Sequence, residues 1–232
     1  MTAPSSLRWI LKTQRHDVDR LGVLSGTFNP PTRAHAALAE AALKQLMLDE
    51  VVFVLPQTPP HKDRMAASLE DRAAMLRLTV EGKLHFSAAI TEHGMFLDIY
   101  LALKPEFAQS AKMIFLAGRD AAERILLNWP YPDPEKALEE MFAKFEMAVA
   151  RRTGGDAPGN QFEVPPESPA AQHRSKIHVV ELSQAYANMS ASEVRKRVAR
   201  GVEIETFVPA QIAQFIRERR LYASDVLEAG GP

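Results

Sequence analysis

The chain has 232 residues, 46% of them hydrophobic and 25% charged, which is the composition of an ordinary globular protein. The 28 Lys and Arg residues against 29 Asp and Glu residues leave a net charge of −1, so no overall basic field exists to bind nucleic acid. Cysteine is absent, which excludes disulfides, thiolate metal sites and cysteine catalysis. No apolar run is long enough to span a membrane. We therefore expect a cytoplasmic protein.

Short apolar segments alternate along the chain with segments of helical periodicity. The apolar segments predict strands at 21–25, 51–55, 84–90, 112–117, 146–150 and 177–182. Apolar residues at helical spacing predict helices at 33–47, 69–80, 96–103, 121–127, 135–145, 190–200 and 210–219. This alternation predicts an α/β fold: a Rossmann-like parallel sheet with helices on both faces and a small helical C-terminal part. Such a sheet binds its ligands beyond the carboxyl ends of its strands.

Three segments lie outside this pattern. Residues 1–20 carry mixed charge and are predicted to form a loosely held N-terminal extension, and residues 223–232 form a C-terminal tail. Residues 21–222 are predicted to form a single domain. Within it, segment 153–175 is rich in Gly and Pro and poor in apolar residues, which predicts a flexible surface loop.

The turn after the first predicted strand carries the first chemical signal, Ser25-Gly26-Thr27-Phe28-Asn29-Pro30-Pro31-Thr32-Arg33-Ala34-His35. Gly26 allows a sharp turn or a close approach to a ligand. Thr32 is placed to cap the next helix, which puts His35 at the positive end of the helix dipole, where phosphate binds. An ordinary Thr cap beside a surface histidine gives the same local pattern. No Gly-Lys-Ser or Gly-Lys-Thr follows, which argues against a P-loop.

A second signal lies near the C-terminus, at Asn188-Met189-Ser190-Ala191-Ser192-Glu193-Val194-Arg195. Ser190 and Glu193 have the spacing of a capping box, which begins many helices that have no active site nearby. Considered together with the first turn, a Ser-capped helix with Arg195 suits a clamp on the β- and γ-phosphates of a nucleotide.

These two signals resemble motifs of the HxGH-type nucleotidyltransferases, and in particular of the nicotinate/nicotinamide mononucleotide adenylyltransferase family. The first turn is similar to the family's GGTFDPxHxGH-like motif, with Thr32 in place of the first His and His35 matching the second. The second signal resembles ISSTxIR. Further similar stretches follow in the family's order: 55–62 resembles PPHK, 117–120 resembles GxD, 146–154 resembles the strand ending in RRPG, and 205–222 resembles the closing LVPxxV, YI and LY pattern.

The resemblance implies that an adenylyl group passes from ATP to nicotinate or nicotinamide mononucleotide, giving a dinucleotide and pyrophosphate in NAD biosynthesis. The implied catalytic residues are His35, Thr32 and Arg195. The implied ATP-binding residues are Gly26, Thr27, Phe28, Gly118, Asp120, Ser190 and Arg195. The implied mononucleotide-binding residues are Asn29, Lys62, Trp129 and Arg152. Mg²⁺ is expected to arrive bound to ATP, because the sequence offers no cluster of carboxylates to cage it.

Two departures from the family pattern bear on the substrate. Ala34 stands where the family carries Gly, and its methyl group narrows the space beside the nucleotide. Met95 and Phe96 replace a Tyr-Thr pair that contacts the nicotinate side of the substrate in the family. Losing that hydroxyl alters the polar recognition of a carboxylate. The resemblance therefore supports adenylyl transfer more strongly than it supports nicotinate as the acceptor.

Several alternatives stay open at this point. One is a related nucleotidyltransferase with a different phosphate acceptor, such as a cytidylyltransferase. Another is a non-catalytic protein that binds nucleotides with the same fold, and a third is an interaction module that uses segment 153–175. The choice between nicotinate and nicotinamide and the formation of a homo-oligomer are also open.

Overall fold

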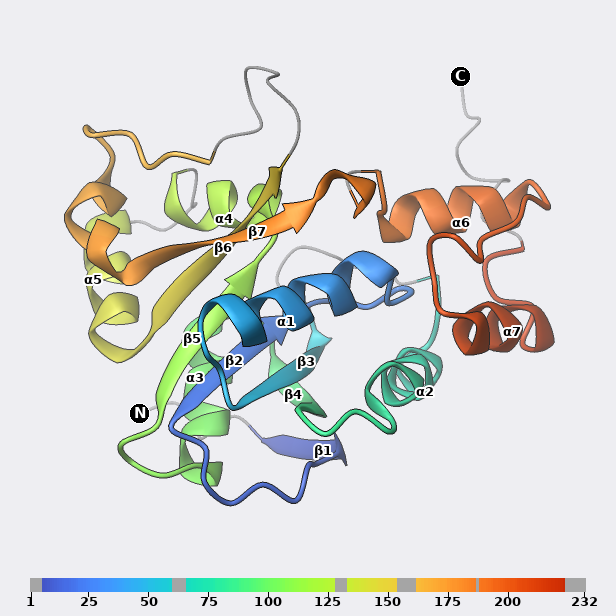
Figure 1. Ribbon diagram of the computed structural model, residues 1–232, viewed down its shortest axis with the longest axis horizontal. Helices are drawn as coiled ribbons and strands as arrows, with labels where there is room; N and C mark the ends of the chain where they lie inside the picture. The colour runs from blue at the N-terminus through green and yellow to red at the C-terminus, as the bar shows by residue number, and fades with distance from the viewer. Residues whose placement is uncertain (1–5, 60–65, 128–132, 154–161, 187, 224–232) are drawn as a thin grey trace.

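The computed structural model describes residues 6–59, 66–127, 133–153, 162–186 and 188–223. Within these residues, one seven-stranded sheet runs through the molecule in the order β1-β4-β3-β2-β5-β6-β7 (Figure 1). Its strands are β1 (Leu7–Leu11), β2 (Arg20–Ser25), β3 (Glu50–Thr58), β4 (Phe86–His93), β5 (Lys112–Ala117), β6 (Glu146–Thr153) and β7 (Ile177–Ser183). All neighbouring strands are parallel except β1, which pairs antiparallel with β4.

The helices follow the predicted alternation with the strands. They are α1 (Arg33–Gln45), α2 (Leu69–Val80), α3 (Phe96–Leu103), α4 (Arg119–Leu126), α5 (Pro134–Lys144), α6 (Ala191–Ala199) and α7 (Ala210–Glu218). Short 3-10 turns occur at η1 (Lys104–Glu106), η2 (Pro169–Lys176) and η3 (Gln184–Tyr186). In the part of the chain that the structure describes, no helix has the length and apolarity needed to cross a membrane.

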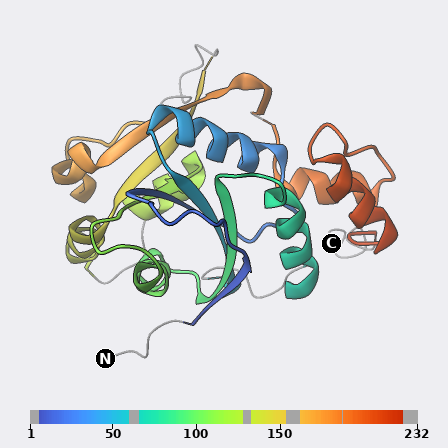
Figure 2. The ribbon, with the colours of Figure 1, turned by 60° about the horizontal axis from the view of Figure 1, so that its bottom comes forward.

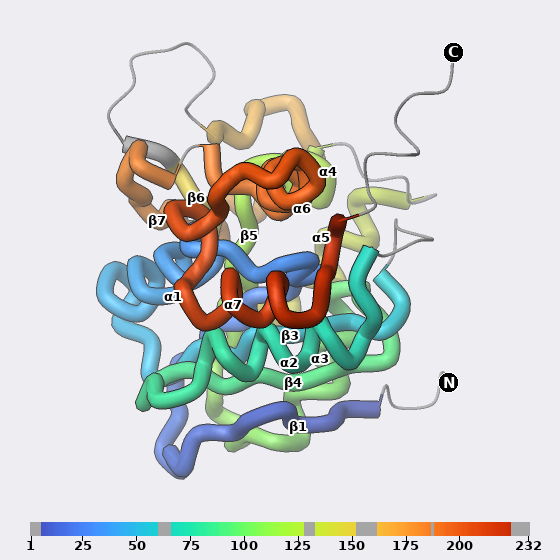
Figure 3. The backbone as a smooth tube through the Cα atoms, turned by 90° about the vertical axis from the view of Figure 1, so that its right-hand side faces the viewer, coloured from blue at the N-terminus to red at the C-terminus, as the bar shows by residue number. Residues whose placement is uncertain are grey.

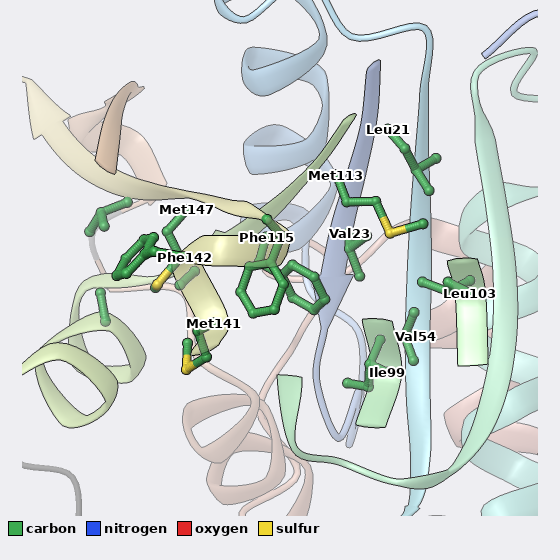
Figure 4. Packing of buried hydrophobic residues seen from close by; sticks show 14 of the residues in the cluster. Leu21, Val23, Val54, Ile99, Leu103, Met113, Phe115, Met141, Phe142 and Met147 are labelled. Atoms are coloured by element: carbon green, nitrogen blue, oxygen red, sulfur yellow. The ribbon is translucent and has the colours of Figure 1, made fainter. Parts of the chain in front are cut away.

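Helices cover both faces of the sheet, because successive residues of each buried strand point to opposite faces. On one face, α1 and α2 pack against strand residues that include Leu24 and Phe53. On the other face, α3, α4 and α5 pack against a cluster that includes Val23 and Phe115 (Figure 4). The predicted Rossmann-like α/β fold is confirmed.

The third strand of the chain extends further than its sequence predicts. The prediction ends this strand before Pro56, but β3 continues to Thr58. From Leu55 onward β3 pairs with β4 and no longer with β2. A strand that is paired on one side tolerates a proline, which has no N–H to donate to a second neighbour.

Part of the N-terminal segment is held by the sheet and the core, so the prediction that residues 1–20 are loosely held is wrong for Leu7–Leu11, Thr13 and Val18. Leu7–Leu11 forms the edge strand β1 beside β4 (Figure 2). Farther along, the Thr13 hydroxyl donates to Glu50 at 2.8 Å, and Val18 is buried in the core. The five residues of this edge strand show too little alternation of apolar and polar side chains for the sequence to predict a strand there.

The segment predicted to be a flexible surface loop, 153–175, also packs in part against the core. Residues 154–161 lie outside the described part of the chain. Beyond them, Phe162 and Ala170 are buried in the cluster that covers β5 and β6. The prediction is therefore wrong for 162–175, where Phe162 and Ala170 are buried and Val164 packs against the same cluster.

The C-terminal helices form a small unit beside the sheet, as predicted. Figure 3 shows α7 between α6 and α2. Met75 of α2, Val194 of α6 and Ile212 of α7 are fully buried in one shared cluster. This unit places the N-terminus of α6 at the carboxyl edge of the sheet.

Candidate active site

A cavity of about 680 Å³ opens at the carboxyl edge of the sheet, where β2 and β5 end. The N-termini of α1, α4 and α6 line it. The predicted site residues that line this cavity are Gly26, Thr27, Thr32, His35, Gly118, Asp120, Ser190 and Arg195. Two motifs that lie far apart in the sequence therefore meet in one place.

Among the described side chains, two predicted site residues, Phe28 and Asn29, are not part of the cavity lining. Phe28 and Asn29 are buried beneath the loop rather than exposed in the cavity. Lys62 and Trp129 lie outside the described residues. The backbone of Arg152 pairs with Leu182 in the β6–β7 ladder. The implied role of Phe28 in binding ATP, and those of Asn29, Lys62, Trp129 and Arg152 in binding the mononucleotide, stay predictions.

The start of α1 holds His35 in one orientation. Thr32 is the N-cap residue, and its backbone N–H donates to His35 Nδ1 at 2.9 Å. Histidine thus fills the position that Glu or Gln takes in a capping box. Because a backbone N–H can only donate, Nδ1 is the acceptor, and the proton of the neutral ring is on Nε2.

Burial also fixes the charge of this histidine. Desolvation lowers the pKa of His35 from 6.5 to about 4, against a smaller raising effect from the Thr32 backbone. The ring packs edge-on against Phe28, with 5.3 Å between the centroids. At neutral pH the imidazole is therefore uncharged and carries an N–H donor at Nε2.

The loop between β2 and α1 is tightly built. The Gly26 N–H donates to the Val54 carbonyl at 3.1 Å, which ties the loop to β3. Phe28 has a left-handed backbone with φ of 43°, and its ring is 1% exposed. A Cβ atom at Gly26 would stand 3.3 Å from that ring, a contact tight enough that the ring would have to shift by a few tenths of an ångström. The Asn29–Pro30 peptide bond is cis.

The start of α6 joins the same site. The Ser190 hydroxyl accepts the Glu193 N–H at 3.1 Å, which is the cap predicted from the sequence. Arg195 Nη1 donates to the Asn29 carbonyl at 2.8 Å, and its Nη2 donates to Ser192 at 3.3 Å. Arg195 therefore bridges the two motifs at the rim of the cavity.

The start of α4 leaves open space. Gly118 is its N-cap residue, and Asp120 lies in its first turn. A Cβ atom at Gly118 would meet nothing within 4 Å. The cavity is therefore open at Gly118, and Asp120 lines it nearby.

The wall formed by the start of α3 is apolar. Met95 and Phe96, which stand where the family carries a Tyr-Thr pair, both line the cavity. The Phe96 ring packs on Phe115 with 4.6 Å between centroids, so this residue also belongs to the core. Ala34 lines the cavity from α1.

Two buried residues support the loop from behind, and no motif in the sequence assigned either of them a role. Arg72 Nη1 of α2 donates to the Thr27 carbonyl at 3.2 Å. The Tyr222 hydroxyl donates to Asn29 Oδ1 at 2.9 Å. Nothing in the sequence indicated a role for Arg72. For Tyr222 there was one indication, because this residue is the last of the C-terminal stretch that resembles the family pattern.

Comparison with known proteins identifies the family to which the chain is similar. The cytidylyltransferase-like family matches residues 23–197. The probable nicotinate-nucleotide adenylyltransferase of Bordetella avium is 31% identical, over 88% of this chain and 98% of that protein. The protein of the same name from Geobacter sulfurreducens is 30% identical, over 89% of this chain and 99% of its own length.

A solved structure shares the fold. Plasmodium falciparum nicotinic acid mononucleotide adenylyltransferase complexed with NaAD has a TM-score of 0.67 at 14% identity, over 88% of this chain and 98% of that chain. At this identity the likeness concerns the fold alone. The extent of the family match and the full-length relatives show that this chain belongs to the cytidylyltransferase-like family and, within it, to the nicotinate-nucleotide adenylyltransferases.

Proposed function

We propose that the protein transfers the adenylyl group of ATP to nicotinate mononucleotide and releases pyrophosphate, a step of NAD biosynthesis. The observation that carries the proposal is the convergence of three helix N-termini, His35 and Arg195 on one cavity. Helix N-termini and arginine side chains are groups that proteins commonly use to bind phosphate. The full-length relatives named for this activity support the same reaction.

The reaction needs no base and no covalent intermediate. A phosphate oxygen of the mononucleotide, already anionic near neutral pH, attacks the α-phosphorus of ATP. The bond from that phosphorus to the bridging oxygen breaks, and pyrophosphate leaves with the electron pair. Catalysis then consists of holding the two phosphates in line and stabilising the charge that develops between them.

Each residue of the cavity is assigned a role according to where it lies. His35 donates from Nε2 to an oxygen of the α-phosphate, and its fixed tautomer keeps that donor in place as charge develops. Ser190, the N-terminus of α6 and Arg195 hold the β- and γ-phosphates and then the departing pyrophosphate. Asp120 contacts the adenosine. The apolar wall at Met95 and Phe96 faces the pyridine ring.

Mg²⁺ enters as the ATP complex and neutralises phosphate charge. Among the described residues, no group of three or more His, Cys, Asp or Glu side chains comes together to hold a metal ion. Lys62, Trp129 and Arg152 are proposed to contact the mononucleotide. A cytoplasmic location and a homo-oligomeric state stay predictions.

Pyrophosphate release tests this proposal. The reaction contains ATP and Mg²⁺ with nicotinate mononucleotide, nicotinamide mononucleotide or no acceptor, and a parallel reaction contains CTP with simple phosphate alcohols. We expect turnover that depends on the pyridine mononucleotide and is faster with the nicotinate form. Turnover in the reaction with CTP and a phosphate alcohol, and in no reaction with ATP, would show that the protein is a cytidylyltransferase. ATP binding without pyrophosphate release would leave a nucleotide-binding protein that is not an enzyme.

A further inference from the structure

The loop 26–32 is held at successive points by side chains that lie outside the cavity. Arg72 of α2 donates to the Thr27 carbonyl, and Tyr222 donates to the Asn29 side chain. Neither Arg72 nor Tyr222 lines the cavity. Arg72 belongs to α2 and Tyr222 follows α7, two elements that share the buried cluster with α6.

The backbone after α7 is bent to bring Tyr222 to this loop. The helix ends with the Leu221 N–H donating to the Ile216 carbonyl and the Arg220 N–H donating to the Arg217 carbonyl. This is the pattern of a Schellman motif, in which the left-handed residue is usually Gly. Here Arg220 takes that conformation with φ of 51°, and Tyr222 follows with φ of 65°. Such strained conformations persist where the surrounding structure fixes them.

Tyr222 is packed so that its hydroxyl has little freedom. Its side chain is 3% exposed, in the cluster that joins α2, α6 and α7. The accepting residue, Asn29, is 5% exposed. A hydrogen bond between two buried groups is costly to break, because neither group can turn to water instead.

Arg72 is the second support and is also buried, with 3% exposure. Its guanidinium donates to the carbonyls of Ser68 and Thr27, so its fork joins the start of α2 to the loop. Burial lowers the pKa of this group from its ordinary value. The neighbouring Asp71 is engaged by Arg219, which ties the end of α7 to the start of α2.

We propose that Arg72 and Tyr222 are positioning residues for adenylyl transfer, which hold Thr27 and Asn29 so that the loop presents its backbone and His35 to the nucleotide. This inference rests on the proposed function. It gives the C-terminal helices a part in the reaction beyond supplying Arg195. The hydroxyl of Tyr222 acts through Asn29 and touches no substrate.

The test is the variant Tyr222→Phe, which removes one hydroxyl and keeps the ring in its cluster. We expect kcat to fall about 3–10-fold, the size of one lost neutral hydrogen bond, with little change in the KM for ATP. Hydrogen exchange of a peptide covering 24–36 should become faster at the same time. The matched control is Tyr100→Phe: this tyrosine lies in α3 away from the cavity and packs on Phe145. Its kcat and exchange should equal those of the wild type.

A double-mutant cycle separates positioning from general destabilisation. If Tyr222 acts through Asn29, adding Tyr222→Phe to Asn29→Ala should lower kcat no further than Asn29→Ala alone. Two fully additive losses would overturn the inference, and so would a Tyr222→Phe variant with unchanged kcat and unchanged exchange. If the wild type releases no pyrophosphate, the proposed function fails, and the exchange of the 24–36 peptide alone decides whether Tyr222 positions the loop.

Discussion

The two edges of the parallel sheet are built from the same strands but are closed in different ways. At the amino edge, the buried Glu50 carboxylate accepts from the Thr13 and Ser87 hydroxyls, and Asp49 accepts two backbone N–H groups at the entry to β2. At the carboxyl edge, the strands end at a cavity of about 680 Å³ surrounded by helix N-termini. The first edge satisfies its polar groups within the chain, and we propose that the second presents its donors to a nucleotide. Stability and function therefore occupy opposite ends of the same strands.

Replacing His35 with Ala should produce the largest loss at the carboxyl edge. We expect kcat for pyrophosphate release to fall roughly 10²–10³-fold, the scale of losing one oriented donor to a developing oxyanion. Steady-state kinetics at saturating ATP measures the change. The matched control is His85→Ala at the amino edge, where the ring contacts the Asp49 carbonyl. An unchanged kcat in His35→Ala would remove this residue from the mechanism.

Replacing Glu50 with Ala should produce the complementary loss at the amino edge. The change leaves the buried Ser87 hydroxyl and the half-buried Thr13 hydroxyl without their acceptor. We therefore expect unfolding to become easier by about 3 kcal/mol, or a Tm lower by roughly 6–12 °C. The kcat of the folded enzyme should stay unchanged. Glu40→Ala is the control, since that carboxylate forms a half-exposed pair with Lys83 and contributes little. A large fall in kcat with normal stability would contradict the separation of the two edges.

The depressed pKa of His35 makes a linked prediction about acid. With a folded pKa of about 4 and an ordinary value of 6.5, the unfolded chain binds a proton that the folded chain excludes. Stability is therefore unaffected above pH 6.5 and falls as the pH drops from 6.5 towards 4, by about 2 kcal/mol at pH 5. Urea unfolding of the wild type and of His35→Gln between pH 5 and pH 8 measures the difference. Parallel curves for the two proteins would show that the histidine has an ordinary pKa.

The smallest expected effect concerns the N-terminal segment. Thr13→Val keeps the side-chain shape but removes the hydroxyl that donates to Glu50. We expect a loss of about 1 kcal/mol in the free energy of unfolding and no change in kcat. In a Glu50→Ala background the same substitution should cost less, because its acceptor is already missing. Equal costs in the two backgrounds would mean that Thr13 acts elsewhere.

The fold was largely predictable because its local signals are strong and agree with one another. The bounds predicted for α2, α3 and β5 match the structure, since each has a clear apolar pattern. The edge strand β1 was missed because its partner β4 comes much later in the chain. Phe162 and Ala170 were missed for a related reason: their burial depends on α5 and β6, which nothing nearby in the sequence indicates.

The candidate site divides in the same way. Gly26, Thr32 and His35 lie in one short stretch, and Ser190 and Arg195 lie in another, so each stretch could be interpreted as a phosphate-binding helix start. The residues that support the loop from behind could not be found like this. Arg72 is 45 positions from its contact in the loop, and Tyr222 is 193 positions from its own. Contacts of that kind appear when the chain is folded.

Detection of the product is the most direct test of the account. The wild type is incubated with ATP, Mg²⁺ and nicotinate mononucleotide, and the mixture is separated and identified by mass spectrometry. The account predicts equal amounts of the dinucleotide and pyrophosphate, with the yield strongly reduced in His35→Ala and retained in Glu50→Ala. Conversion of ATP without any dinucleotide, or a His35→Ala variant as productive as the wild type, would contradict it.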